Sequence, residues 1–405
     1  MLRGAVQGGP GMIANTRVAT SPVAKPSNAQ VIQRYYLEDA WLKGLARREK
    51  EQIWQHPYDR PHCYLLTNLE AYLDLYRVTG NPLYFVAMLG AWELYSTHWQ
   101  HAGGSISIIA FEKDPPGSNS LRQKLGEFCG SSFWVFLSQR FQLLHPDEER
   151  FATEIEKSIY NVALANQDGR KGLRYHTIME GKKEMGTRVN TCCEGQGTRL
   201  LGSLPEHIFS IAPDGLYLHL YEPSTIRWKL GEQRMELVVK ARFPFETAVH
   251  CKIKTNVPSR VNLRIRVPSW ASKAMEVSVK GIIAGAGKPG TYLSLIRQWS
   301  DGDVIEFNLP ATVRMTRYTG EDQIAGKLRY SFEYGPILLA AVGSSTVDLV
   351  VEKGHTAETV VRQLEPDDGS PLHLTVAGNA GQKLVPYFEI EDEEFTCYPT
   401  VTVSA

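Results

Sequence analysis

The chain has 405 residues, enough for two or three domains that each have a core of their own. Lysine plus arginine and aspartate plus glutamate number 44 each, so no net charge favours nucleic acid or an anionic membrane as a partner. No apolar run approaches the ~20 residues that span a bilayer. Six cysteines are too few for a disulfide scaffold in a chain of this length, which favours reduced thiols and a cytoplasmic location.

The first 37 residues are basic and contain no acid before Glu38. Glycine, proline, serine and asparagine dominate them, and they lack the apolar segment of a secretion signal. This composition predicts a flexible leader over residues 1–37.

A helical pattern follows. Apolar residues recur at three- and four-residue steps over 69–76 and 83–92, with a Thr-Gly-Asn-Pro break at 79–82. A second pair of apolar stripes flanks the break at 145–147. Repeated antiparallel helix pairs are typical of an α-solenoid or an α/α toroid.

Two long irregular segments interrupt these helices, at 101–118 and at 168–194. Loops of this length inside a compact helical domain are usually functional or disordered. The acids and cysteines in or beside them are Glu112, Glu127, Cys129, Cys192 and Cys193. Their grouping indicates one shared site.

The adjacent pair Cys192-Cys193 is the centre of that site. Neighbouring side chains do not share one face of a helix or strand, so we expect the pair on a turn, where both sulfurs can converge on a metal. The alternative is two buried cysteines that pack as small hydrophobes.

After residue 211 the pattern changes to short runs with partial alternation, at intervals that suit a β-sandwich. These runs are 216–221, 235–239, 261–267 and 304–309. Alternation in the third run places Arg264 and Arg266 on a solvated face. We predict an α+β multidomain chain. Its parts are a helical domain at 38–210, a β-sandwich domain at 211–315 and a C-terminal β domain at 316–405.

Several motifs together carry a resemblance to a known family. They are Gly103-Gly104-Ser105, Pro115-Pro116-Gly117-Ser118, Gly126-Glu127-Phe128-Cys129-Gly130, Asn190-Thr191-Cys192-Cys193-Glu194-Gly195-Gln196-Gly197 and Leu204-Pro205-Glu206. On these residues the chain resembles the β-L-arabinofuranosidase family, glycoside hydrolase family 127. The resemblance implies an (α/α)6 barrel followed by β-sandwich domains. It also implies a Zn²⁺ ion held by Glu127, Cys129, Cys192 and Cys193.

The resemblance further implies a retaining glycosidase that cleaves β-L-arabinofuranosides or related sugars. Cys192 is the nucleophile, and zinc ligation keeps its thiol deprotonated at neutral pH. We predict Glu112 as the acid/base. An alignment without gaps places Ala110 there instead, and the chain is then a catalytically degenerate sugar-binding or structural relative that retains zinc.

Three other residues in or beside the two loops, His101, Tyr175 and His176, are candidates for contacts with the sugar. The chain has fewer helices before Gly103 than a closed barrel needs, so we expect a partial barrel that is shortened on its N-terminal side. An open helical arc exposes apolar faces, which favours a homo-oligomer. A third interpretation is a helical-repeat interaction protein with purely structural zinc.

Overall fold

The computed structural model describes residues 39–54, 63–107, 118–121, 126–169, 172–186, 191–363, 372–379 and 381–403. The predicted leader lies outside these residues, as do Glu112 and Ala110. The described chain divides into two compact units. One unit holds residues 146–149 and 203–310, and the other holds the described parts of 23–145, 150–202 and 311–405.

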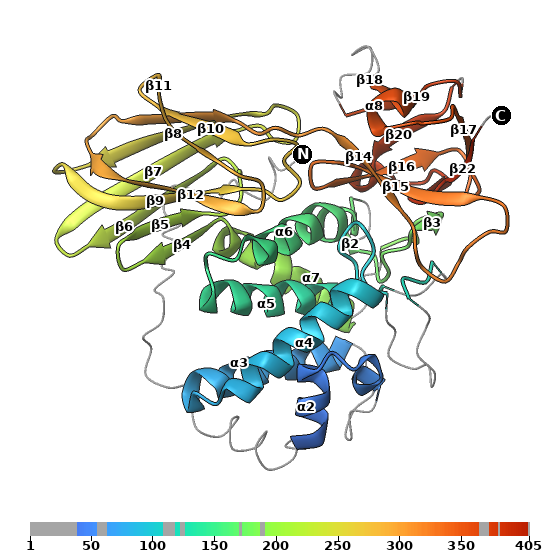
Figure 1. Ribbon diagram of the computed structural model, residues 1–405, viewed down its shortest axis with the longest axis horizontal. Coiled ribbons are helices and arrows are strands. Elements are labelled where there is room, and N and C mark those ends of the chain that lie inside the picture. The colour runs from blue at the N-terminus through green and yellow to red at the C-terminus, as the bar shows by residue number, and fades with distance from the viewer. Residues whose placement is uncertain are drawn as a thin grey trace. The chain divides into compact units, whose positions relative to one another are not determined.

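Helices dominate the first half of the described chain (Figure 1). They are α2 (Asp39–Ala46), η2 (Lys50–Trp54), α3 (Cys63–Thr79), α4 (Pro82–His98), α5 (Phe128–Leu144), α6 (Glu149–Ser158), the π-helical η3 (Ile159–Leu164), α7 (Cys192–Ser203) and η4 (Leu204–His207). Gly80, at a φ of 70°, and Asn81, whose side chain accepts a hydrogen bond from the Leu83 N–H, separate α3 from α4. Both predicted helix pairs are therefore confirmed.

The buried face of α4 follows only part of the apolar pattern over 83–92. Trp92 is buried, Leu83 and Leu89 are half-buried, and Val86 is 40% exposed. Tyr84 and Met88 are also buried. Because α4 is apolar on most sides, periodicity alone does not single out the face that packs.

Short strands follow the helical hairpins, and further strands close the same unit. They are β1 (Gln167–Asp168), β2 (Gly172–Leu173), β3 (Glu180–Gly181), β14 (Val313–Arg317), β15 (Leu328–Tyr334), β16 (Ile337–Val342), β17 (Asp348–Val351), β18 (Val361–Gln363), β19 (Leu374–Val376), β20 (Lys383–Pro386), β21 (Phe395–Thr396) and β22 (Thr400–Val403), with α8 (Ala357–Val360) and η5 (Tyr387–Glu389).

The C-terminal strands form a sheet in the order β17-β22-β15-β16-β20-β19-β18, with β14 paired to β15 and β21 to β16. Strand β3, from the irregular segment before the cysteine pair, pairs with β21. Met179 from that segment shares a buried cluster with Leu338, Tyr387 and Phe395. The C-terminal strands therefore support the segment that leads to the cysteines.

The other unit consists mainly of β-strands. They are β4 (Phe209–Ala212), β5 (Gly215–Leu218), β6 (Ser224–Leu230), β7 (Gln233–Ala241), β8 (Ala248–Thr255), β9 (Ser259–Val267), β10 (Met275–Val279), β11 (Ile282–Gly287), β12 (Thr291–Trp299) and β13 (Val304–Asn308). Among the described residues they form two sheets, in the orders β11-β10-β13-β8-β7-β6 and β12-β9-β5-β4. The four runs with predicted alternation correspond to β5, β7, β9 and β13.

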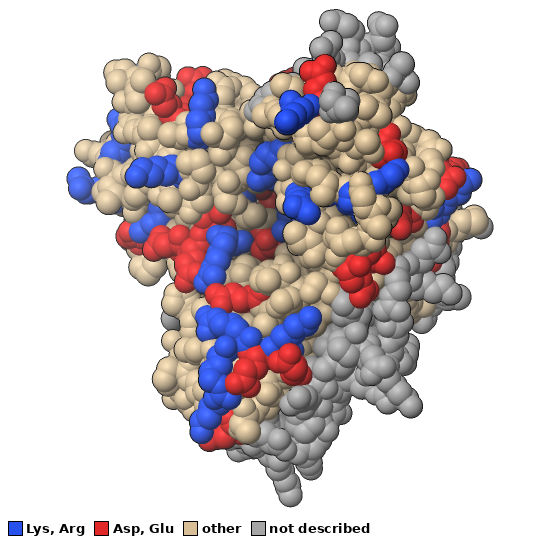
Figure 2. All heavy atoms as spheres, turned by 45° about the vertical axis from the view of Figure 1, so that its right-hand side comes forward, with Lys and Arg blue, Asp and Glu red and all other residues tan. Residues whose placement is uncertain are grey.

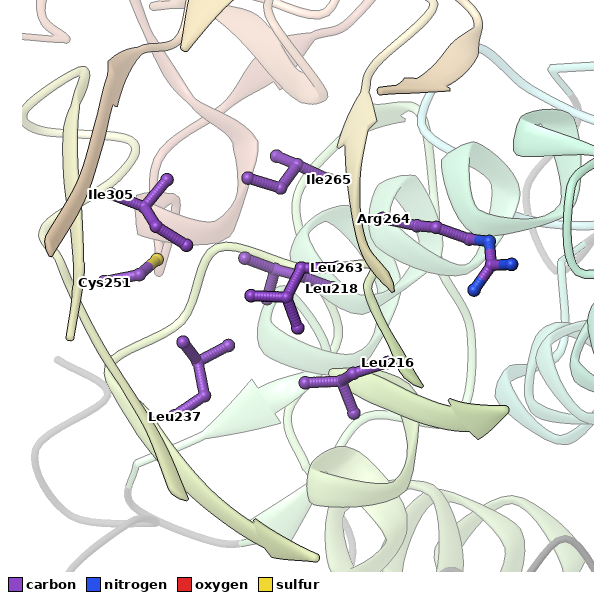
Figure 3. A pocket seen from close by; sticks show the side chains of 8 residues that line it. All are labelled: Leu216, Leu218, Leu237, Cys251, Leu263, Arg264, Ile265 and Ile305. Carbon is purple, nitrogen blue, oxygen red and sulfur yellow. The ribbon is translucent and has the colours of Figure 1, made fainter. Parts of the chain in front are cut away.

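Side chains from both sheets line one apolar pocket (Figure 3). Leu218 and Ile265 come from one sheet, and Leu237, Cys251 and Ile305 come from the other. The two sheets therefore face each other across a shared apolar interior.

The two arginines of β9 have different surroundings. The Arg264 side chain points away from the apolar side chains of the pocket (Figure 3). Its guanidinium pairs with the Asp214 carboxylate at 2.7 Å. Arg266 is fully buried and pairs with Glu149 at 2.6 Å. The prediction that Arg266 faces solvent was wrong, because alternation along a strand does not show whether the second face is also covered.

Among the described residues, no helix combines the length and the apolar character that crossing a membrane requires. Figure 2 shows basic and acidic side chains interspersed on the face that it draws, without a large area of one sign. That distribution agrees with the equal counts of the two charges.

Candidate metal centre and active site

Three cysteines from distant parts of the sequence lie together. The Sγ of Cys129 is 3.4 Å from the Sγ of Cys193 and 3.7 Å from that of Cys192. All three sulfurs lie within 4.8 Å of one another. Cys129 and Cys193 are buried, whereas Cys192 is partly exposed. Cys192 is therefore the most exposed of the three residues.

Two helices begin at this cluster. Cys129 is the second residue of α5, and Cys192 and Cys193 are the first two residues of α7. The expectation of a turn was wrong, because at the first turn of a helix adjacent side chains can reach a common point beyond the helix end. Helix N-termini carry free N–H groups and positive potential, which favour thiolate. The Cys129 N–H faces the Cys193 Sγ at 3.5 Å.

Glu127 supplies a carboxylate beside the sulfurs. It immediately precedes α5 and is buried, and its Oε2 lies 3.6 Å from the Cys129 Sγ. A backbone hydrogen bond from the Thr177 N–H to the Gly126 carbonyl (2.9 Å) fixes the chain before it. Gly126 has a φ of 77°, and a Cβ there would lie 3.0 Å from the Thr177 carbonyl. The position therefore requires glycine.

The predicted sugar contacts Tyr175 and His176 lie beside this carboxylate. The Phe128 N–H donates to the Tyr175 carbonyl at 2.9 Å, and His176 is paired with Glu127 in an antiparallel bridge. The Tyr175 hydroxyl lies 3.6 Å from the Cys192 Sγ. These residues are brought together with the cysteines by backbone pairing.

Glu184 orients His176 and was missed by the sequence analysis. Its carboxylate accepts the His176 N–H at 2.6 Å and lies 3.1 Å from the ring Nδ1. Burial alone would raise the pKa of Glu184, but these hydrogen bonds outweigh burial and lower it. A carboxylate on Nδ1 selects the tautomer in which Nε2 is the acceptor. Nothing in the spacing of these two residues distinguishes Glu184 from the other acids nearby.

His101 has a different environment. It is buried, its Nε2 donates to the Ser120 carbonyl at 2.9 Å, and its Nδ1 lies 2.9 Å from the Ser105 hydroxyl. Burial lowers the pKa of His101 to about 4, so the ring is neutral at pH 7. Both ring nitrogens hold loop residues, and among the described contacts none joins His101 to the cysteines. This geometry favours a role in loop structure over contact with the sugar.

The three sulfurs have separations that suit ligands of a tetrahedral zinc ion, and the Glu127 carboxylate lies beside one of them. Zn–S bonds of ~2.3 Å and a Zn–O bond of ~2.0 Å place sulfurs about 3.8 Å apart, and sulfur and oxygen about 3.5 Å apart. The sulfur–sulfur distances of 3.4 and 3.7 Å and the sulfur–oxygen distance of 3.6 Å are close to these values. The hydrogen bond with Cys129, followed by burial, raises the pKa of the Cys193 thiol well above its usual range. A divalent cation would offset the crowding of negative charge that opposes ionisation.

Comparison with known proteins identifies two matching family models. The model described as β-L-arabinofuranosidase, GH127 catalytic domain, matches residues 33–206, and the GH127 middle domain matches residues 215–311. None of the curated proteins matches the chain.

Several solved structures are similar to the chain. A GH127 β-L-arabinofuranosidase from Geobacillus stearothermophilus T6 has a TM-score of 0.68 at 19% identity, over 84% of this chain and 60% of that one. A protein named as a glycoside hydrolase gives 0.67 at 16%, over 84% and 66%. A GH127 β-arabinofuranosidase gives 0.72 at 16%, over 94% and 68%. At these identities the likeness shows the fold, and the chain spans less than two thirds of the length of the first two structures.

Proposed function

We propose, from the premise that this chain belongs to the β-L-arabinofuranosidase family, glycoside hydrolase family 127, that it is a retaining glycoside hydrolase. Its substrates are β-L-arabinofuranosides or related sugars. One observation carries the proposal: the sulfurs of Cys129, Cys192 and Cys193 converge at two helix N-termini, with the Glu127 carboxylate beside Cys129. This cluster lies inside the stretch that matches the catalytic-domain model.

We infer that Zn²⁺ is the metal and that these four residues hold it. The three sulfurs lie within 4.8 Å of one another, and the Glu127 Oε2 lies 3.6 Å from one of them, the Cys129 Sγ. Thiolate sulfur and carboxylate oxygen are both ligands that zinc takes. When bound, zinc supplies thiolate at neutral pH by lowering the pKa of the ligating thiols.

Cys192 is the nucleophile because it is the most exposed of the three residues. The Cys192 Sγ attacks the anomeric carbon while Glu112 donates a proton to the leaving oxygen, so the C–S bond forms as the glycosidic C–O bond breaks. Glu112 then takes a proton from water, which attacks the same carbon and releases the Cys192 sulfur. Two displacements retain the configuration of the sugar. We propose that Tyr175 and His176 contact the sugar hydroxyls beside this sulfur.

Membership of the family also supports a more detailed assignment of the domains. We infer that the helices belong to an (α/α)6 barrel, that the two facing sheets are a β-sandwich, and that the domains divide near residues 210 and 315. The catalytic-domain match ends at residue 206, and the middle-domain match covers 215–311. A homo-oligomer and a cytoplasmic location stay predictions from the sequence.

The test is hydrolysis of p-nitrophenyl β-L-arabinofuranoside with metal content measured in parallel. We expect one zinc per chain and turnover that is lost in Cys192→Ser and in Glu112→Gln. Cys251→Ala, which removes a thiol of the sandwich interior, is the matched control and should keep both zinc and turnover. Turnover that survives Glu112→Gln contradicts the assigned acid, and a chain without zinc contradicts the site.

One observation favours the alternative of a degenerate relative with zinc retained. Three thiolates and a carboxylate fill a tetrahedral shell, as they do in structural zinc sites, and leave no position open. One zinc per chain together with no turnover on any arabinofuranoside would support this alternative.

A further inference from the structure

One face of the β-rich unit carries an excess of basic side chains. Strands β6, β7 and β8 lie side by side in the six-stranded sheet (Figure 1). Leu237 and Cys251 line the apolar pocket (Figure 3), so the residues that alternate with them on these strands face outward. The exposed cations at these outward positions form the basic face. They are Arg227, Lys229, Arg234, Lys240, Lys252 and Lys254.

Few acids offset these charges. Glu236 is the only carboxylate at an outward position of the three described strands, and it accepts hydrogen bonds from Arg227 at 2.5 Å and from Lys254 at 2.6 Å. On the next strand, β13, the Glu306 carboxylate pairs with His250 at 3.0 Å. The other cations of the basic face have no carboxylate partner among the described residues. They are Lys229, Arg234, Lys240 and Lys252.

The register of the strands places some of these cations against other basic residues. Lys229 lies directly opposite Arg234, and Lys240 lies opposite His250. Like charges directly opposite each other destabilise a sheet. Outward side chains are about 5 Å apart on neighbouring strands and about 7 Å apart along one strand. The basic face is therefore a closely spaced array of positive charge that Glu236 alone does not balance.

A polyanion complements this array. The whole chain has equal numbers of basic and acidic residues, so the excess is a local property of this face. An extended polymer with a negative charge on each repeat unit can place successive charges over several of these cations. Many weak contacts of this kind add up, because each one after the first forms between groups that are already held together.

The outward side chains favour a carbohydrate over other polyanions. Single-stranded nucleic acid stacks its bases on aromatic side chains, and no outward residue of these three strands is phenylalanine, tyrosine or tryptophan. Binding to a membrane surface scales with the apolar area that enters it, and the largest apolar outward residue, Val238, is half-buried. Because the chain belongs to a glycoside hydrolase family, a carbohydrate is the polyanion that fits its chemistry.

We infer that the basic face binds an acidic polysaccharide with a carboxylate on each sugar and so holds the chain on polymers of this class. The inference goes beyond the proposed function and does not depend on it, because binding requires no turnover. It assigns a role to the unit that contains the match to the GH127 middle domain.

Binding of polygalacturonate, which has one carboxylate per sugar, to the full chain tests the inference. We expect the methyl-esterified polymer to bind about 10-fold more weakly than the acid form, because esterification removes the charge. The affinity for the acid form should also fall about 10-fold when NaCl is raised from ~50 to ~300 mM, since salt screens exposed charges. Equal affinity for the two forms, or no binding of either, overturns the inference.

Charge reversal shows whether the basic face is the binding surface. Lys229→Glu combined with Lys252→Glu should weaken binding of polygalacturonate about 10- to 100-fold, and neither change removes an ion pair. Lys273→Glu combined with Lys288→Glu is the matched control, because both lysines are exposed in the same unit but lie outside the three strands. The control changes the net charge by the same amount and should bind nearly as tightly as the unaltered chain. Equal weakening in the two double variants contradicts a role for this face.

A footprint on the unaltered chain covers a failure of the charge-reversed variant to fold. Acetylation of lysines by acetic anhydride, followed by mass spectrometry, should slow at Lys229 and Lys252 when polygalacturonate is added. It should not change at Lys273 and Lys288. Uniform protection, or none, overturns the inference. Tighter binding of a DNA duplex or of phosphatidylserine vesicles, with protection of the same lysines, would assign the face to that polyanion and refute the carbohydrate.

Discussion

Replacing Lys183 by methionine should remove a pH dependence of stability that the chain carries above pH 7. Lys183 is buried, and its Nζ donates to the Ala165 carbonyl at 3.0 Å and to the Tyr387 carbonyl at 2.8 Å. Burial, with a smaller contribution from Arg174, lowers the pKa of Lys183 to about 7. In the unfolded chain the same group titrates near 10.4.

The direction of the effect follows from these two pKa values. Between them, Lys183 is neutral in the folded chain and protonated in the unfolded chain, so unfolding takes up a proton and rising pH stabilises the fold. The cost of burying the charge is fully present below pH 7 and is gone above about pH 10.4. Each pH unit in this window is worth about 1.4 kcal/mol, which gives about 3 kcal/mol between pH 7 and pH 9.5.

Urea unfolding of the native chain and of Lys183→Met, at pH 7 and pH 9.5 and with equal metal loading, measures this contribution. Cysteines and tyrosines titrate in both chains, so the difference between the two unfolding free energies isolates Lys183. We expect that difference to shift by about 3 kcal/mol in favour of the native chain at the higher pH. Lys182→Met is the control, because Lys182 is exposed. A difference that does not change with pH would refute the reasoning.

Three further predictions concern other contacts. Glu184→Gln removes the charge that orients His176 and should lower kcat/KM for the arabinofuranoside about 10-fold at constant zinc content, and an unchanged kcat/KM would exclude that role. Arg266→Met removes the guanidinium that pairs with the buried Glu149 and should lower the unfolding free energy by about 3–5 kcal/mol in urea. The double variant that also carries Glu149→Leu should recover most of this loss, and a loss that persists there points to packing instead. Cys251→Val adds apolar volume to the pocket between the sheets and should raise the unfolding free energy by about 0.5–1 kcal/mol, so a lower melting temperature would show that the pocket is already full.

Local sequence signals predicted the elements well. The Gly-Asn-Pro break before α4 and the alternation in β7 are short-range patterns that a single element can satisfy. Local patterns could not predict the cysteine cluster, because Cys129 and Cys192 come from separate helices. The sequence indicated a shared site only because long loops of unusual composition lie beside both cysteines.

Long-range partners could not be predicted in this way. Arg266 alternates like a solvent-facing residue, and only the fold shows that Glu149 covers it. Glu184 resembles an ordinary surface acid in a chain that has many. Its role depends on hydrogen bonds to His176, and such contacts leave no periodic pattern.

The cysteine cluster lies where both α5 and α7 begin, and this arrangement has a consequence for folding. Cys129 and Cys192 are 63 residues apart in sequence, so a metal that binds both closes a long loop in the same way as a disulfide. Closing a loop of that length in the unfolded chain lowers its conformational entropy by an amount worth about 4 kcal/mol. If the chain binds the proposed metal, that metal would act as a reversible cross-link, and its removal should lower the free energy of unfolding even where no sugar is bound.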